Sequence, residues 1–411
     1  MPILLSEDLA YSLPKMHKVR QEVFSKRLED IEGTIRAEFS RDIIREKIKP
    51  GAKVAVGVGS RGLKNLALIV KTTVDCISEA GGVPVIVTAM GSHGGGTEAG
   101  QREMLAGYGI TEEAMGVPVI SKVDSTLIGK TRSRNVEVWF DNEALAADLV
   151  IPINRIKQHT HFSSDLQSGL CKMLVIGFGN HVGCTAYHES DFKYFGTTLV
   201  EATELIMQKA KVGFGLAIVE NARDDTYLIE AVPGEKLFER EKALLKIADE
   251  NYPRIPIKDI DILIVKEIGK NISGTGIDPH VIGKSYYIDI FPLPVPKIDK
   301  MVLLDATDKT HGNLFGIGSF DVCTRRVFEK MDYEKTYTNC IAAKSHEDAK
   351  IPIIANDEEE AIRIAVKILK PGADRSNLKI VKIKNTLEVE EIEVSDALLP
   401  YVKSQKELEL L

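Results

Sequence analysis

Residues 53–88 read KVAVGVGSRGLKNLALIVKTTVDCISEAGGVPVIVT, and this stretch decides the fold class. Its first part, 53–59, is an apolar run typical of a buried strand, and 63–80 has the apolar periodicity of a helix. Two glycines end that helix, and a second buried run follows at 83–88. A strand, a helix and another strand of these lengths predict parallel pairing with a right-handed crossover.

The same alternation continues through the first half of the chain. Short apolar runs bounded by turn residues predict further strands, and longer amphipathic stretches predict helices. We expect strands at 136–140, 147–153, 213–219 and 227–232, and helices at 197–211 and 235–250.

A domain boundary is expected at the proline-bearing stretch YPRIPIK, residues 252–258. After it we expect strands at 259–265, 301–305 and 378–383, helices at 319–331 and 357–369, and a peripheral helix in the tail SQKELELL. The chain is therefore predicted to be an α/β protein with two domains and mostly parallel, Rossmann-like sheets. The expected domains are a catalytic one at 1–257 and a C-terminal one at 258–411, with the active site in the cleft between them.

Composition limits the classes of function. The 411 residues are 44% hydrophobic and 27% charged, with a net charge of −7 and no long basic run, so neither a nucleic-acid nor a membrane partner is expected. The five cysteines form no CxxC pair, which disfavours a disulfide framework. Acidic residues near the N-terminus and the lack of an 18-residue apolar run favour the cytoplasm.

Polar residues follow the first two predicted strands at their carboxyl ends. Ser60 and Arg61 follow the first strand, and Ser92 and His93 follow the second. Ligands of parallel α/β sheets bind outside the carboxyl ends of the strands. We therefore expect Arg61 and His93 to lie at the same edge of the sheet.

Four of the nine histidines fall between residues 159 and 188. His159 and His161 alternate along an expected extended segment, while His181 and His188 are seven residues apart and share a face if the segment is helical. Imidazole serves as a general acid or base near neutral pH and as a ligand for nickel, zinc or iron. The alternative for any single one is a hydrogen-bonded loop histidine.

Lys172 lies in the almost wholly apolar run GLCKMLVIGFG. A lysine in such surroundings either reaches a polar cleft or loses its proton, and a neutral amine can form a covalent tether to a cofactor. A lysine that extends along a helix flank to solvent is the alternative.

Two glycine-rich turns follow predicted strands. GSHGGG, residues 91–96, precedes a helix as anion-binding turns do, but it matches no nucleoside-triphosphate or dinucleotide motif. GKNISGTG, residues 269–276, offers the cation Lys270 at a strand end of the second domain. Each could instead be a turn that glycine permits for geometric reasons alone.

These segments together resemble the lactate racemase superfamily, the nickel-pincer-nucleotide hydroxyacid racemases and epimerases. The resemblance covers most of the chain and rests on the stretches GSRG, AMGSHGG, RIKQHT, SGLCKMLVIGFG and GKNISGTG and on the spacing of one lysine and its neighbouring histidines. It points to a branch of the superfamily whose substrates are poorly defined.

The resemblance implies a role for each candidate. Lys172 would hold the pyridinium nucleotide through a thioamide, and His188 would be the protein ligand of its nickel. His93 would be one acid/base, and the other would be His159 or His161, of which His159 within RIKQHT is favoured. Arg61 and Lys270 would hold the substrate carboxylate, and we expect cofactor contacts from Ser60, His161 and His181.

The implied reaction interconverts two antipodes of a hydroxy acid. One histidine removes the hydroxyl proton while hydride passes to the cofactor, and a second histidine serves the opposite face of the planar keto acid. The family's acidic-Thr-Arg motif is replaced here by Val58-Gly-Ser-Arg, and the stretch before the lysine reads SGLC. The expected substrate is therefore a 2-hydroxy acid or sugar acid other than lactate.

Two other classes of function fit parts of the same pattern. A zinc or iron hydrolase could use the histidines with a carboxylate from Asp165, Glu189 or Asp191, but it would give Lys172 no role. A binding protein without cofactor is the third hypothesis. The expected partners are the small-molecule substrate and the enzymes of cofactor maturation, and a homo-oligomer is compatible with the sequence.

Overall fold

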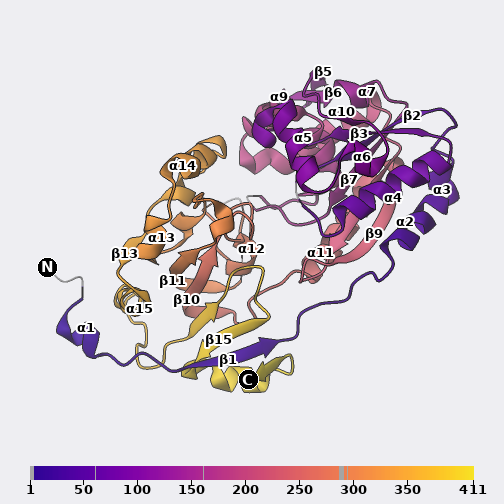
Figure 1. Cartoon of the computed structure of the whole chain (residues 1–411). Coiled ribbons are helices and arrows are strands. Elements are labelled where there is room, and N and C mark those ends of the chain that lie inside the picture. The colour runs from indigo at the N-terminus through magenta and orange to yellow at the C-terminus, as the bar shows by residue number, and fades with distance from the viewer. Residues whose placement is uncertain (1–3, 61, 161, 287–290, 294) are drawn as a thin grey trace. The chain divides into compact units, whose positions relative to one another are not determined.

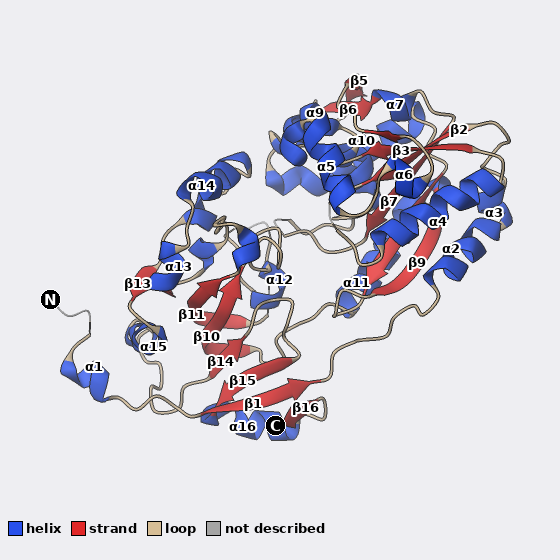
Figure 2. Ribbon diagram, in the orientation of Figure 1, coloured by secondary structure: helices blue, strands red, loops and turns tan. Residues whose placement is uncertain are grey.

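The computed structural model describes residues 4–60, 62–160, 162–286, 291–293 and 295–411. The chain divides into two units, whose helices and strands are labelled in Figure 1 and coloured by type in Figure 2. The large unit is Ser25–Tyr252, and the split unit joins Met1–Phe24 to Pro253–Leu411. Among the described residues, no helix has the length and apolar character needed to cross a membrane.

The large unit is built on a six-stranded sheet with the order β4-β3-β2-β7-β8-β9. The first five strands in this order run parallel, and β9 is antiparallel to β8. The expected parallel pairing of the first two strands is confirmed, with Val58 opposite Thr88 at their carboxyl ends. The strands are β2 (Lys53–Val58), β3 (Val83–Thr88), β4 (Val119–Ile120), β7 (Leu149–Arg155), β8 (Phe214–Glu220) and β9 (Thr226–Pro233).

Both faces of this sheet are buried, as is usual for parallel sheets. Val54, Val56 and Val58 of β2 belong to a core shared with α2 (Ile31–Ser40), α4 (Leu66–Glu79) and α5 (Glu98–Gly107). Ala55 points the other way, into a core with α10 (Phe195–Lys209) and α11 (Leu237–Glu250). This alternation fixes the register of the strands, because a shift of one residue would exchange the two cores.

The segment that carries Lys172 and two of the candidate histidines is helical throughout most of its length. It comprises α8 (Leu170–Lys172), a π-helical turn (Met173–Gly177) and α9 (Asn180–His188). Phe178 anchors it to the sheet, where Gly57 lacks the side chain that would collide with the ring. A hairpin of β5 (Ser125–Lys130) and β6 (Glu137–Asp141) packs against this segment. π-Helical turns such as the one in this segment are frequent at functional sites.

Shorter helices complete the large unit. They follow strand ends or connect longer elements, and polar side chains cap two of the three. They are α3 (Asp42–Arg45), α6 (Glu112–Met115), capped by Thr111, and α7 (Asn142–Leu145), capped by Asp141.

The split unit has an eight-stranded sheet with the order β13-β12-β11-β10-β14-β15-β1-β16. The strands from β13 to β14 in this order are parallel, and the remaining pairs are antiparallel. The strands are β1 (Met16–Gln21), β10 (Asp259–Ile268), β11 (Lys297–Ala306), β12 (Val322–Thr324), β13 (Ile353–Ala355), β14 (Ile380–Ile383), β15 (Glu391–Ser395) and β16 (Leu408–Leu410).

The helices of the split unit are mostly short. The long, amphipathic α15 is capped by Asp357, as the acidic start of that stretch leads one to expect. The helices are α1 (Ser6–Ala10), α12 (Pro279–Ile282), α13 (Arg325–Glu329), α14 (Tyr333–Ala342), α15 (Glu358–Lys367) and α16 (Leu399–Ser404).

The α/β class with mostly parallel sheets is confirmed, but three local expectations are corrected. Residues 1–24 were expected in the first domain, whereas β1 pairs with β15 and β16 of the split unit and so joins that sheet. The helix expected at 319–331 is instead β12 followed by α13, because a strand partner exists on both sides. The expected tail helix is the strand β16, since the edge of β1 is open to it.

Candidate functional site

The order of the strands places three candidate segments side by side in the large unit. Ser60 follows β2, the loop with His93 follows β3, and the segment with His159 follows β7. Because β2 lies between β3 and β7, the two histidine-bearing loops flank the end of β2. The carbonyl of Ser60 accepts a hydrogen bond of 2.6 Å from the Tyr108 hydroxyl, which fixes that end.

The glycine-rich loop 91–96 adopts a backbone that needs its glycines. Gly91 has φ 59°, and Gly94, Gly95 and Gly96 all have φ between 64° and 67°. The backbone N–H of Gly91 donates to the carbonyl of Gly177 at 3.1 Å, so the loop is bonded to the π-helical turn. A side chain at Gly91 would lie 3.0 Å from the carbonyl oxygen of Ile176. The glycines therefore allow close approach of the loop to the helical segment.

The far end of the same loop meets the start and middle of α9. A Cβ at Gly96 would stand 3.1 Å from the ring of His181, and the hydroxyl of Ser92 lies 3.5 Å from the Cys184 thiol. His93 lies between these contacts and is exposed. The loop that carries His93 thus packs against α9, the helix that carries His181 and His188.

His188 is held in the orientation that metal ligands adopt. Its Nδ1 lies 2.7 Å from the carbonyl oxygen of Cys184, one helical turn earlier. An N–H at Nδ1 that donates to a backbone carbonyl leaves the lone pair on Nε2, and metal-binding histidines commonly show this arrangement. Nε2 is therefore the nitrogen of this ring that could bind a metal ion.

Cys184 is a titratable group in this cluster that the sequence analysis did not single out. Burial alone would raise the pKa of its thiol, but the contacts with His188 and Ser92 outweigh it and lower the pKa to about 7. The sequence signal was the spacing of four residues between Cys184 and His188, which places both on one helix face.

The segment with His159 leaves the sheet as a closed loop. Residues 157 and 168 pair as an antiparallel bridge, and the backbone N–H of His159 donates to Gln167 Oε1 at 2.7 Å. Asn154 Nδ2 donates to the carbonyl of Gly169 at 2.7 Å, which ties the end of β7 to the start of α8. His159 is therefore fixed at its backbone rather than carried on an untethered loop.

Two of the candidate histidines contact one aromatic cluster. The ring centroid of His159 is 4.4 Å from that of Phe162, and Phe162 is 5.6 Å from Phe195. His188 reaches the same Phe195 at 5.8 Å. His159 and His188, 29 residues apart in the sequence, thus border a common apolar wall.

Lys172 ends the single turn of α8 and is half-buried. Its neighbours Leu170, Cys171 and Met173 all point into the core. The helix has no side-chain cap of its own at Gly169, and the cap comes from the buried carboxyl of Glu241, which accepts the Cys171 N–H at 2.9 Å. Glu241 occupies a position on the apolar face of α11, and that charge on an apolar stripe was its sequence signal.

The start of α9 is held by a buried polar contact. Asn180 has φ 53°, and its side-chain amide donates to Asp141 at 2.9 Å and to Ser125 at 3.0 Å. Burial raises the pKa of Asp141 to about 6, against the effect of its hydrogen bonds. This contact joins α9 to the hairpin of β5 and β6, so the direction of α9 depends on it.

An ion pair lies at the carboxyl ends of β7 and β8. Arg155 Nη1 donates to Glu220, and Asp224 is 3.9 Å from the same guanidinium nitrogen. Burial raises the pKa of Glu220 although Arg155 acts against it. The pair joins the strand that leads into the His159 loop to its neighbour.

Lys270 lies in the split unit, in the turn after β10, as expected from the sequence. Its ammonium group donates to Asn339 Oδ1 and to the carbonyl of Gly274, and it stands 4.7 Å from the ring centroid of Phe315. Its backbone N–H donates to Thr310 at 3.1 Å. Lys270, which was expected to bind the substrate, therefore stabilises the turn 269–276 through these hydrogen bonds.

Two of the predicted site residues, Arg61 and His161, lie outside the described residues. Within the described part of the chain, no group of three or more His, Cys, Asp or Glu side chains could hold a metal ion by itself. Catalytic zinc sites usually take three protein ligands.

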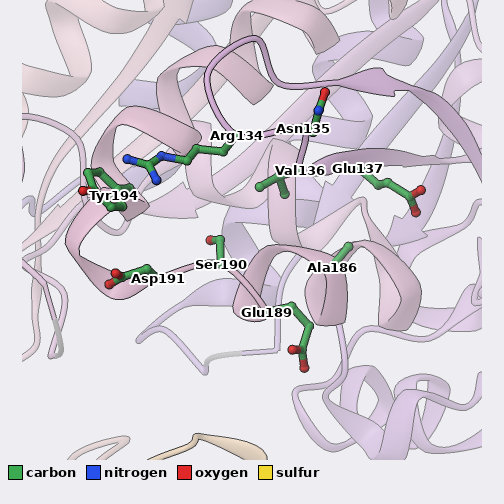
Figure 3. Close-up of a pocket in the computed structure, with 9 residues that line it drawn as sticks. All are labelled: Arg134, Asn135, Val136, Glu137, Ala186, Glu189, Ser190, Asp191 and Tyr194. Atoms are coloured by element: carbon green, nitrogen blue, oxygen red, sulfur yellow. The ribbon is translucent and has the colours of Figure 1, made fainter.

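A surface pocket of about 360 Å³ lies beyond the C-terminal end of α9 (Figure 3). The guanidinium of Arg134 stacks over the Tyr194 ring at 3.2 Å from its centroid. Glu189 and Asp191, two of the carboxylates considered for a hydrolase, line this pocket, but none of the described candidate histidines and lysines does. Its lining residues are Arg134, Asn135, Val136, Glu137, Ala186, Glu189, Ser190, Asp191 and Tyr194.

The chain is similar in fold to proteins of known structure. The lactate racemase apoprotein of Thermoanaerobacterium thermosaccharolyticum aligns with 90% of this chain and 94% of its own, with a TM-score of 0.51 and 14% sequence identity. The chain has a lactate racemase-like fold. No protein-family model and no curated protein sequence matches it. At this identity the likeness establishes the fold, and any activity has to be argued from the residues.

Proposed function

We propose that this protein is a racemase or epimerase of a 2-hydroxy acid or sugar acid that uses a nickel-pincer nucleotide bound at Lys172. The observation that carries the proposal is the seating of loop 91–96 on the helical segment 170–188. The loop that carries His93 packs against the helical segment that carries His181 and His188, and the contact of His188 Nδ1 with the Cys184 carbonyl leaves Nε2 for a ligand. The lactate racemase-like fold supports the same assignment.

Each described candidate residue of the large unit has a role in this proposal. Lys172 would hold the nucleotide covalently, and His188 would bind its nickel through Nε2. When bound, the cofactor supplies the hydride acceptor and donor. Ser60 and His181 are proposed cofactor contacts because they border the same loop and strand end.

The two acid/base groups are proposed to be His93 and His159. They follow β3 and β7, on either side of β2, so they approach a substrate above the end of β2 from opposite sides. One imidazole takes the hydroxyl proton on one face, and the other returns a proton on the opposite face. Racemisation requires such a pair because the two antipodes present their hydroxyl groups to opposite sides.

The proposed substrate carries a carboxylate, which Arg61 would bind in bidentate fashion. Lys270 is the second proposed contact.

Intact-mass spectrometry with elemental analysis tests the proposal on chain co-expressed with the cofactor maturation enzymes. We expect a mass increment of a few hundred daltons on Lys172 and an equimolar amount of nickel. Lys172→Arg keeps the positive charge but cannot form the thioamide, so it should carry no increment. His188→Gln should keep the increment and lose nickel. An unmodified chain without nickel under these conditions would refute the assignment.

A further inference from the structure

Glu241 is a carboxyl group inside the apolar core of the large unit. It lies on α11 between Leu237 and Leu244, and only 1% of it is exposed. Its Oε2 accepts the Cys171 N–H, and its Oε1 has no hydrogen-bond partner among the described residues. A charged residue is rarely this buried without a compensating contact. The contact it makes is with the turn that carries Lys172.

The N-terminus of α8 needs an acceptor from elsewhere. The first N–H groups of a helix have no partner within the helix, and the residue before α8 is Gly169, which has no side chain to supply one. A Cβ at Gly169 would lie 2.4 Å from Glu241 Oε1, so the glycine makes room for the carboxyl group. Glu241 thus performs from α11 the capping that a polar residue usually performs locally.

The same turn is held from its other side by the sheet. Asn154 at the end of β7 donates to the Gly169 carbonyl at 2.7 Å. The peptide groups just before Lys172 are therefore fixed by one acceptor on α11 and one donor on β7. A lysine that must react with a cofactor through one atom needs a fixed backbone, because small displacements of a reacting group lower the rate of the reaction.

We infer that Glu241 is a positioning residue for Lys172, which it fixes by capping the helical turn from which the lysine extends. The inference rests on the proposed function for the importance of Lys172, but not for the contact itself. Burial raises the pKa of Glu241 to about 7, so ionisation of this carboxyl destabilises the folded chain. An apolar side chain would not have this effect. A glutamine could make the same hydrogen bond without that cost.

Competitive labelling of lysines in the full chain, without cofactor, tests the inference. The chain is treated briefly with acetic anhydride, and peptide mass spectrometry compares Lys172 with the surface lysines of the same molecule. Glu241→Gln keeps an oxygen acceptor and should label Lys172 at the wild-type rate. Glu241→Met keeps the volume but loses the acceptor, so the turn loosens. Its Lys172 should label about fivefold faster, the ratio that corresponds to one net hydrogen bond.

Leu244→Ala is the matched control, because it removes buried volume from the same helix but takes no hydrogen bond away from the Lys172 turn. It should lower the thermal midpoint and leave Lys172 labelling unchanged. Amide hydrogen exchange at Cys171 should accelerate in Glu241→Met alone. If Glu241→Met does not fold, Glu241→Asp serves instead, since its carboxyl is one methylene too short to reach the turn.

Equal labelling of Lys172 in wild type and Glu241→Met, or equal acceleration in Leu244→Ala, would overturn the inference. Adduct formation with the maturation enzymes separates it from the proposed function. A wild-type chain that never acquires the adduct refutes the function and leaves the labelling result standing. A Glu241→Met chain that acquires the adduct as fast as wild type refutes the positioning role alone.

Discussion

Replacing Glu241 with glutamine should change the stability of the large unit in a way that depends on pH. The carboxyl is fully buried, and burial raises its pKa from 4.5 to about 7, partly offset by its contacts with the α8 turn. Between these two values the folded chain holds a proton that the unfolded chain has released. The contribution of Glu241 is therefore fully present below about pH 4.5 and is lost as pH rises through about 7.

The size of the effect follows from the shift. The pKa difference of about 2.5 units (7 minus 4.5), at 1.36 kcal/mol per unit, corresponds to about 3 kcal/mol of lost stability above pH 7. Glutamine keeps the acceptor for the Cys171 N–H and has no charge to bury. Glu241→Gln should therefore match wild type near pH 4.5 and exceed it by up to about 3 kcal/mol at pH 8.

Urea unfolding followed by tryptophan fluorescence measures this difference. Trp139, the single tryptophan, lies on β6 of the large unit and reports on that unit alone. Glu239→Gln on the exposed face of the same helix is the control, and its stability difference from wild type should stay near zero at both pH values. The reasoning would be refuted if Glu241→Gln were more stable than wild type by the same amount at pH 5 and at pH 8. It would also be refuted if the stability of wild type rose relative to that of the variant as the pH rises.

Two further predictions concern contacts around the candidate histidines. Arg155→Met leaves Glu220 buried without its partner and should lower the free energy of unfolding in urea by about 3 kcal/mol. The double variant with Glu220→Leu should recover most of that stability, and an equally unstable double variant would contradict this. Gly91→Ala should cost more than Gly95→Ala in thermal unfolding. Both have positive φ, which costs about 1–2 kcal/mol, but only Gly91 also faces a backbone oxygen, 3.0 Å from its Cβ. Equal midpoints would show that the loop is not seated on the helix.

Local patterns in the sequence were sufficient for most of the elements. The strands β2, β3, β7 and β8 are continuous apolar runs bounded by turn residues, and such runs form buried parallel strands almost regardless of context. Failures occurred where pairing partners lie far away in the sequence. β16 was expected as helix because its pattern is short, and its strand conformation comes from the edge of β1, nearly 400 residues earlier.

For the candidate site, the sequence determined which residue types are present and which of them share an element. His181, Cys184 and His188 share α9 because their spacings of three, four and seven suit a helix. The sequence also predicted that Ser60 and the His93 loop leave the sheet from one edge, because both follow parallel strands.

Only the tertiary structure decided what lies against these groups. The hydrogen bond from Gly91 to Gly177, the contact between Ser92 and Cys184, and the cap that Glu241 gives to α8 join residues 70 to 92 positions apart. No local periodicity encodes such contacts, because they arise from how two helices and a loop pack on one sheet. Sequence patterns specify elements, whereas the partner of each buried polar group depends on packing.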